Sequence, residues 1–212
     1  MNGQVVVIGV AGCSGSGKTA LAEELAREME GTHFYIDHYY RDLSHLIYEE
    51  RCRQNFDHPE QIESKLLIAH VGLLAEGHAI RQPQYDFANH TRFTGMYKHV
   101  ESPRLLIVDG IFALHYEGLR ALYDLSVYVD TPDDVCYQRR LARDVRERGR
   151  TPESVAKHYA ETVRPMAEQY VRPSAVHADL IVKGTESLDW SVEAVFAALS
   201  ERQLLDLINA ED

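Results

Sequence analysis

Short apolar runs alternate along the chain with stretches in which apolar residues recur every three or four positions. The short runs are rich in Val, Ile and Leu, as in the buried strands of a parallel sheet. In the first periodic stretch, Leu21, Leu25 and Met29 recur every four residues, as on one face of a helix. The pattern predicts strands over residues 5–10, 32–37, 104–110, 125–130 and 179–182. It predicts helices over residues 19–29, 59–76 and 114–122, from 132 until Gly149 interrupts, and over 151–170, 188–198 and 201–208. This alternation predicts an α/β fold with a parallel sheet flanked by helices.

Some segments fall outside the alternation. Residues 82–87 and 92–100 read as short extended pieces around a turn, which predicts a small β flap over the sheet edge. No internal repeat or linker divides the chain. We therefore expect a single domain over residues 1–212, with an arginine-rich lid over about 139–150 and a helical tail over about 187–212.

One helix start is marked by its residue types. Thr151 can cap a helix through its hydroxyl, and Pro152 suits the first helical position because its missing N–H is not needed there. Within the helix that follows, Pro165 predicts a kink.

The first strand and the first helix enclose a phosphate-binding loop of the form G-x-x-x-x-G-K-T. Its glycines let the backbone N–H groups point inward at an anion, the lysine adds a mobile positive charge, and the threonine hydroxyl can ligate Mg²⁺. The strand before it and the helix after it aim a helix N-terminus at the phosphates. The looser dinucleotide pattern G-x-G-x-x-A over residues 15–20 is weaker than the Lys-Thr pair. The loop, a P-loop or Walker A motif, consists of Gly12, Cys13, Ser14, Gly15, Ser16, Gly17, Lys18 and Thr19.

Two acids follow predicted strands and should lie at the same sheet edge as this loop. Asp109 closes an apolar strand in the Walker B arrangement, in which the carboxylate reaches the Mg²⁺ shell; the alternative is an ordinary acid at a strand end. Asp37 is the candidate general base that accepts a proton from a substrate hydroxyl; the alternative is a turn or helix cap.

Charge and composition narrow the class. The chain has a net charge of −11, which argues against binding to nucleic acid or to an acidic membrane. No apolar run is long enough for a membrane span, and no secretory signal is evident. Three scattered cysteines do not suggest a disulfide framework, so a cytoplasmic setting is expected.

Residues 139–150 form a basic island, with six arginines against two acids. Such an island suits a small polyanion such as ATP. Arg143 and Arg148 are candidates to fold over the phosphates as a lid that excludes water. The alternative is a solvated basic helix face paired with Asp144 and Glu147.

Six motifs, taken in order, resemble the uridine kinase (uridine–cytidine kinase) family, and the resemblance extends from the first strand to about Asp179. The phosphate loop alone is generic, but the ordered set is specific. The motifs are residues 12–19, 37–40 (Asp-His-Tyr-Tyr), 55–59 (Asn-Phe-Asp-His-Pro), 83–87 with His90 and Arg92, 109–112 (Asp-Gly-Ile-Phe), and 139–150.

The resemblance implies an ATP-dependent kinase that phosphorylates the 5′-hydroxyl of uridine and cytidine, with Mg²⁺ as cofactor. Asp37 would activate that hydroxyl, Asp57 would hold the ribose hydroxyls, and His90 would read the base edge. It also implies a homotetramer and feedback inhibition by pyrimidine triphosphates. The remaining implied positions are Tyr40, Phe56 and Tyr85 around the nucleoside, Arg140 and Arg150 on the nucleoside side, Arg143 and Arg148 on the ATP side, and Thr19 with Asp109 at the metal.

The chain departs from the family pattern at three positions. Asp109 stands where the family usually has Glu, so the metal could be held through water. His158 stands near the ribose where relatives often carry Gln, and Cys13 in the loop suggests sensitivity to thiol oxidation. A neutral imidazole has one donor and one acceptor nitrogen, so His90 predicts that both uridine and cytidine are accepted.

Two other functions stay open from the sequence. One is a P-loop kinase for another small hydroxyl compound, such as nicotinamide riboside, pantothenate or ribulose phosphate. The other is a nucleotide-dependent regulatory switch. The switch is disfavoured because there is no Asn-Lys-x-Asp motif, and because Phe112 stands three residues after Asp109 where a switch would have Gly. The phosphate loop does not distinguish ATP from GTP.

Overall fold

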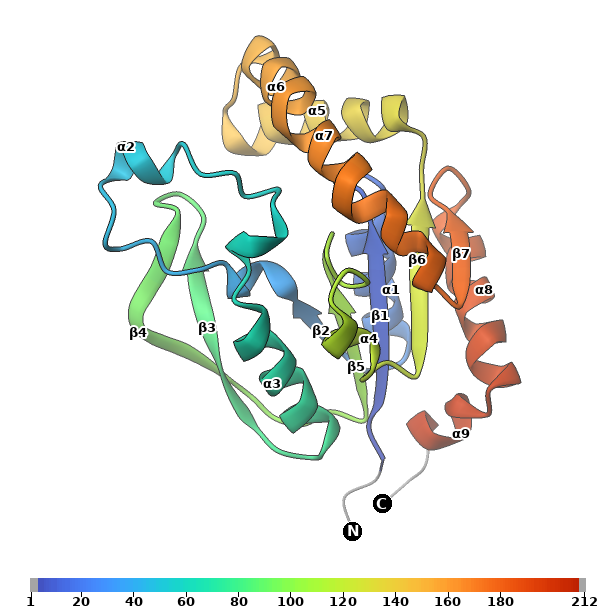
Figure 1. Cartoon of the computed structure of the whole chain (residues 1–212). Helices are drawn as coiled ribbons and strands as arrows, with labels where there is room; N and C mark the ends of the chain where they lie inside the picture. The colour runs from blue at the N-terminus through green and yellow to red at the C-terminus, as the bar shows by residue number, and fades with distance from the viewer. Residues whose placement is uncertain (1–3, 210–212) are drawn as a thin grey trace.

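The computed structural model describes residues 4–209 and has a five-stranded parallel sheet at its centre (Figure 1). The strand order is β2-β5-β1-β6-β7. Residues Val10 and Asp109 are register partners in neighbouring strands. The fold class predicted from the sequence is confirmed. The strands are β1 Val6–Gly12, β2 Thr32–Tyr35, β5 Leu105–Asp109, β6 Leu125–Asp130 and β7 Leu180–Lys183.

Successive residues of β1 enter two different hydrophobic cores, because neighbouring side chains of a strand point to opposite faces of the sheet. Ile8 and Val10 pack with Leu21 and Leu25 of helix α1 on one face. Helices α1 (Lys18–Glu28), α8 (Leu188–Glu201) and α9 (Leu204–Asn209) cover this face.

On the other face, Val7 packs with Leu67, Val71 and Phe112. Helices α3 (Ser64–Ala75) and α4 (Glu117–Arg120) lie there. With both faces covered, the carboxyl edge of the sheet is left for a ligand.

Further helices lie at the end of the sheet toward which the strands point (Figure 1). Helix α5 (Asp133–Arg148) carries the arginines and ends at Gly149, which has a left-handed φ of 61°. Helix α6 (Pro152–His158) follows, and the Thr151 hydroxyl accepts a hydrogen bond from the Ser154 N–H at 3.2 Å, as predicted. No helix within residues 4–209 is long and apolar enough to cross a membrane.

The segment around Pro165, where a kink was predicted, is helical throughout. Two stretches of π-helix, Tyr159–Val163 and Ala167–Val171, flank the three-residue α7 (Arg164–Met166). A proline removes one regular backbone hydrogen bond, and the wider π turns accommodate that loss within the helix. A 3₁₀ helix, Arg172–His177, follows.

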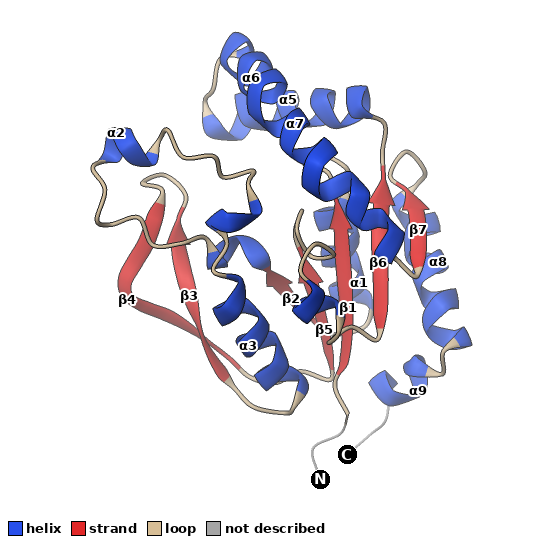
Figure 2. Cartoon of the chain, in the orientation of Figure 1, coloured by secondary structure: helices blue, strands red, loops and turns tan. Residues whose placement is uncertain are grey.

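The predicted flap is present as an antiparallel hairpin beside the main sheet (Figure 2). It consists of β3 (Ile80–Asp86) and β4 (Thr91–Val100), with a register shift between Pro83 and Tyr85. The hairpin projects toward the short helix α2 (Tyr48–Arg51).

Several predicted elements have different bounds; the helix predicted over 114–122 is reduced to α4, and the one predicted over 201–208 begins only at Leu204. Two further differences involve the segments that carry Asp37 and Pro59. Strand β2 ends at Tyr35, and Asp37 lies in a 3₁₀ helix, Ile36–Tyr39. The helix predicted over 59–76 is divided into a 3₁₀ turn, Pro59–Gln61, and α3. The cause is long-range pairing: the Glu63 N–H donates to the Tyr39 carbonyl at 2.8 Å, in an isolated bridge between Tyr40 and Ile62.

Candidate active site

The phosphate loop joins β1 to α1 in a conformation that only small residues allow. Gly15 and Gly17 have φ angles of 87° and 101°, and a Cβ on Gly15 would lie 2.4 Å from the Cys136 carbonyl oxygen. The Lys18 N–H donates to the Ser16 hydroxyl at 3.4 Å. Because the loop follows the end of β1 and leads into α1, the N-terminus of α1 lies at the carboxyl edge of the sheet.

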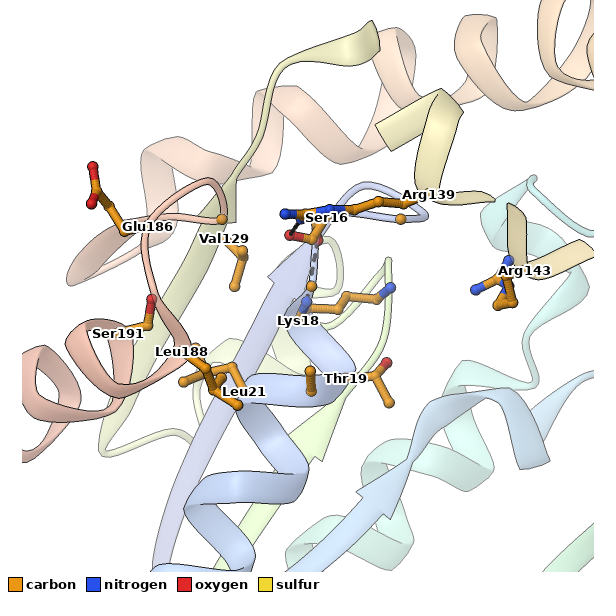
Figure 3. A pocket seen from close by; sticks show the side chains of 14 residues that line it. Ser16, Lys18, Thr19, Leu21, Val129, Arg139, Arg143, Glu186, Leu188 and Ser191 are labelled. Carbon is orange, nitrogen blue, oxygen red and sulfur yellow. Dashed lines mark hydrogen bonds between the residues drawn. The ribbon is translucent and has the colours of Figure 1, made fainter. Parts of the chain in front are cut away.

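A cavity of about 460 Å³ opens at this loop (Figure 3). Lys18 extends from the start of α1 toward the side on which Arg143 of α5 lies, and Arg139 lies over Ser16. Of the predicted ATP-binding residues, Gly15, Ser16, Gly17, Lys18, Thr19 and Arg143 line this cavity, whereas Gly12, Cys13, Ser14 and Arg148 do not.

The opposite wall of the cavity was missed by sequence reasoning. It comes from the segment after β7 and includes Gly184, Glu186, Leu188 and Ser191. A Cβ on Gly184 would lie 2.3 Å from the Ser16 carbonyl oxygen, so a glycine is needed for this segment to approach the loop. The available signal was the position of the segment at the carboxyl end of the last predicted strand.

Cys13 contributes to the core rather than to the cavity. Its side chain is buried and its Sγ lies 3.8 Å from the Tyr128 hydroxyl oxygen. Burial raises the pKa of the Cys13 thiol above its usual value. Because the thiolate is the reactive form, these surroundings argue against the sensitivity to oxidation suggested by its place in the loop.

Asp109 is buried, and one of its two carboxylate oxygens contacts another side chain. Its Oδ2 lies 3.2 Å from Nε2 of His33 on the neighbouring strand β2, and its Oδ1 is buried without a hydrogen-bond partner among the described residues. A buried carboxylate oxygen without a partner is costly unless a ligand or ion satisfies it. Sequence reasoning missed His33, although a polar residue inside an otherwise apolar predicted strand was a signal.

Asp37 lies among charges from both sides of the site. Burial raises the pKa of its carboxyl group. The positive charge of Lys18 opposes this shift, and the negative charges of Asp109 and Asp57 add to it.

Four predicted polar residues form a second group. Nη1 of Arg140 donates to the Ser14 hydroxyl at 2.8 Å and lies 3.9 Å from Oδ1 of Asp57. Nε2 of His158 lies 3.9 Å from Oδ2 of Asp57. Arg140 therefore bridges the phosphate loop and the acid that the motif resemblance places at the ribose.

The predicted aromatic residues also meet. The ring of Tyr40 lies 5.4 Å from that of Phe56 and 5.3 Å from that of Tyr85. The Tyr85 hydroxyl is buried without a hydrogen-bond partner among residues 4–209. Together they make an aromatic cluster that contains one buried polar atom without a partner in the described chain.

His90 stacks on this group. Its ring lies 4.9 Å from that of Phe56 with an interplanar angle of 19°, and its backbone φ of 52° is left-handed. Burial lowers the pKa of His90, and the charges of Arg150 and Arg51 act in the same direction. A lowered pKa favours the neutral ring, the state in which it has one donor and one acceptor nitrogen.

The alternative for Arg143 and Arg148, a solvated helix face paired with nearby acids, is present in part, because both pair with Asp144 and their side chains are 36% and 49% exposed. Arg140 and Arg150 also approach Asp144, whose side chain is fully buried. Arg146 pairs with Glu147 on the exposed surface.

A parallel sheet with this phosphate loop, an acid at the end of the neighbouring strand and the arginine-rich helix α5 defines a P-loop kinase fold. The chain belongs to the phosphoribulokinase/uridine kinase family, whose model matches residues 7–191.

Named relatives agree with this assignment, and solved structures share the fold. A uridine kinase from Aeromonas hydrophila is 45% identical over 184 residues, covering 84% of this chain and 86% of the relative. One from Staphylococcus haemolyticus is 44% identical over 179 residues, covering 83% and 86%. The fold is similar to that of a phosphoribulokinase from Rhodobacter spheroides (TM-score 0.64, 19% identity, 85% of this chain and 70% of that one). It is also similar to that of a D-glycerate 3-kinase from Cryptococcus neoformans (TM-score 0.63, 15% identity, 87% and 88%).

Proposed function

We propose that the protein is a nucleoside kinase that transfers the γ-phosphate of ATP to the 5′-hydroxyl of uridine and cytidine, forming UMP and CMP. The observation that carries the proposal is the pair of contacts made by Arg140, which donates to the Ser14 hydroxyl of the phosphate loop at 2.8 Å and lies 3.9 Å from Oδ1 of Asp57. Two sites joined in this way can hold the donor and the acceptor side by side, and Asp37 is the group proposed to accept the proton of the attacking hydroxyl. The uridine kinases at 44–45% identity support the choice of nucleoside.

In this proposal, each side of the site has its own task. Lys18 and Arg143, which line the loop cavity, neutralise charge on the triphosphate. Asp57 accepts hydrogen bonds from the ribose hydroxyls, with Arg140 and His158 beside it. Asp37 accepts the proton of the 5′-hydroxyl, and its raised pKa makes it a better base than an exposed Asp. Holding both reactants supplies the orientation that phosphoryl transfer requires.

The residues at the loop fit Mg²⁺ as the cofactor. Oδ1 of Asp109 is buried without a partner within the described chain, and the Thr19 hydroxyl lines the same cavity as Lys18. Among residues 4–209 no three His, Cys, Asp or Glu side chains are grouped for a metal. Few protein ligands are typical of Mg²⁺, which is bound with substrate phosphates and water. Bound there, the ion would neutralise charge on the β- and γ-phosphates.

We also propose that the wall formed by Gly184, Glu186, Leu188 and Ser191 receives the base of the donor nucleotide. It faces the phosphate loop across one cavity, and it combines an apolar side chain with polar ones, as base pockets do. His90, neutral and stacked beside Phe56, suits the base of the acceptor, where either tautomer can pair with uracil or cytosine.

ADP release with MgATP against a panel of nucleosides and small alcohols tests the proposal. The panel includes nicotinamide riboside, pantothenate and ribulose 5-phosphate, since the family model covers phosphoribulokinases as well. Release stimulated by uridine and cytidine is expected. Release with another alcohol alone would keep the kinase chemistry and reject the nucleoside.

A further inference from the structure

Asp144 is the most deeply buried charged side chain of the lid. It lies on α5, one turn before the helix ends, and its side chain is 0% exposed. A carboxylate so far from water is stable only when cations and hydrogen-bond donors surround it.

Four guanidinium groups surround it, and they divide between its two oxygens. On Oδ1, Nη2 of Arg143 lies at 3.2 Å and Nη1 of Arg148 at 3.3 Å. On Oδ2, Nε of Arg140 lies at 3.6 Å and Nη1 of Arg150 at 3.4 Å. The Oδ1 pair includes the arginine that lines the loop cavity, and the Oδ2 pair includes the arginine that contacts Asp57. One carboxylate thus connects the donor side to the acceptor side.

The local backbone makes this convergence possible. The Gly149 and Arg150 N–H groups both donate to the Asp144 carbonyl oxygen, and the left-handed turn at Gly149 reverses the chain. Arg148 and Arg150 therefore reach the same acid from the two sides of the turn.

The cluster has an excess of positive charge, because one carboxylate faces four guanidinium groups. Burial lowers the pKa of Arg148, and the neighbouring Arg143, Arg140 and Arg150 act in the same direction, while Asp144 opposes them. Cations held this closely repel one another, and a further anion relieves the repulsion. The triphosphate of the donor is such an anion, and the cavity beside Arg143 is where it would enter.

We propose that Asp144 is a positioning residue that couples the binding of the two substrates. When donor phosphates bind, they draw Arg143 and Arg148 away from Oδ1. The carboxylate then holds Arg140 and Arg150 more firmly in the nucleoside site. This inference rests on the proposed function. In the ligand-free protein the Asp144 carboxylate is shared by four arginines, and with the donor bound it pairs with two of them. Arg140, which also contacts Ser14 and Asp57, transmits the change to the acceptor side. ATP should then tighten nucleoside binding, and nucleoside should tighten ATP binding by the same factor.

The variant Asp144→Asn tests the coupling. An amide has nearly the same shape, but only one of its two ends accepts hydrogen bonds, so it cannot hold both arginine pairs. The affinity for uridine is measured by calorimetry with and without magnesium adenylyl imidodiphosphate, a non-hydrolysable ATP analogue. We expect the analogue to tighten uridine binding about tenfold in the unaltered protein and less than about twofold in the variant. A folded variant that keeps the full coupling would overturn the proposal.

Glu147→Gln is the matched control. Glu147 is an exposed acid on the same helix whose ion pair within residues 4–209 is with Arg146, so its replacement removes one negative charge without touching the cluster. Its coupling should equal that of the unaltered protein. An equal loss of coupling in both variants would mean that net charge matters and not Asp144, and would also overturn the proposal.

A second measurement needs no variant of Asp144. The arginine Nε–Hε signals are followed by NMR in the unaltered protein as the ATP analogue is added alone, with Arg143→Lys and Arg150→Lys used only to assign the signals. The Arg150 signal should shift together with the Arg143 signal. A shift of Arg143 without any shift of Arg150 would contradict the coupling. This result does not depend on uridine, so failure of uridine to bind would count against the proposed function and leave the coupling test valid.

Discussion

The phosphate cradle on the donor side comes from one stretch of chain, whereas the acceptor side is assembled from several. Residues 15–19, at the start of α1, form this cradle, and their geometry follows from local backbone requirements at Gly15 and Gly17. Tyr40, Phe56 and Tyr85 come from three separate segments and meet only in the folded protein. The phosphate cradle can therefore be predicted from a short motif, while the acceptor side depends on tertiary contacts.

The largest expected effect concerns the group that joins the two sides. Asp37→Asn removes the proton acceptor but keeps the shape, so kcat should fall by about 10²- to 10⁴-fold. ATP affinity, measured by calorimetry, should change little because Asp37 does not line the loop cavity. Turnover within about tenfold of the unaltered protein, about 1.4 kcal/mol of barrier, would show that Asp37 is not the base.

The pH dependence of kcat tests the same group without a substitution. The raised pKa of Asp37 means that it becomes protonated at a higher pH than an ordinary Asp. Activity that needs the carboxylate is therefore present above that pKa and is lost as the pH falls through it, by about tenfold per pH unit below it. The acid limb should disappear in Asp37→Asn. An unchanged limb in the variant would assign it to another group.

Asp57→Asn should separate the acceptor side from the donor side. Loss of a carboxylate that receives ribose hydroxyls should lower kcat/KM for uridine by about ten- to hundredfold. The KM for ATP should stay nearly constant, and the exposed Asp134→Asn serves as the control. A matching increase in the KM for ATP would mean that Asp57 affects the donor side as well as the acceptor side, which would contradict the role given to it.

His33→Phe should affect the donor side and not the acceptor side, and its effect should be smaller than that of Asp57→Asn. It keeps a ring on β2 but removes the nitrogen that contacts Oδ2 of Asp109. Removing a partner that orients a metal ligand should raise the Mg²⁺ concentration for half-maximal activity by about tenfold and weaken Mn²⁺ binding seen by electron paramagnetic resonance. The exposed His99→Phe, which loses only a contact to Glu101, should change neither. Unaltered Mn²⁺ binding in His33→Phe would contradict the role of Asp109.

The same contrast explains which features the sequence could predict. The alternation of strands and helices follows from hydrophobic periodicity, so the sheet and the flap were predicted with small errors at the ends. The break at Ile62 was not predicted, because it is set by pairing with Tyr40, more than twenty residues earlier. The bend that places Asp37 in a 3₁₀ turn likewise has no local signal in residue type.

Within the site, the missed residues act through partners distant in sequence. Arg92 donates to the Tyr40 carbonyl oxygen at 2.9 Å and pairs with Glu63, which holds the flap against the segment carrying Asp37. Its place in a motif was recognised, but its structural task was not. Gly184 is needed because it lies close to Ser16, and His33 matters because it contacts Asp109. Both contacts form only in the folded chain.

Phosphorus NMR of a reaction containing MgATP with equal amounts of uridine and cytidine tests the central claim most directly. It identifies the phosphorylated position and compares the two nucleosides in one sample. The account predicts that UMP and CMP both form, each phosphorylated at the 5′-hydroxyl, and that Asp37→Asn forms neither at a comparable rate. A protein that binds ATP but forms no nucleoside monophosphate would contradict the claim, and a cytidine preference above about a thousandfold, roughly 4 kcal/mol, would contradict the role given to His90.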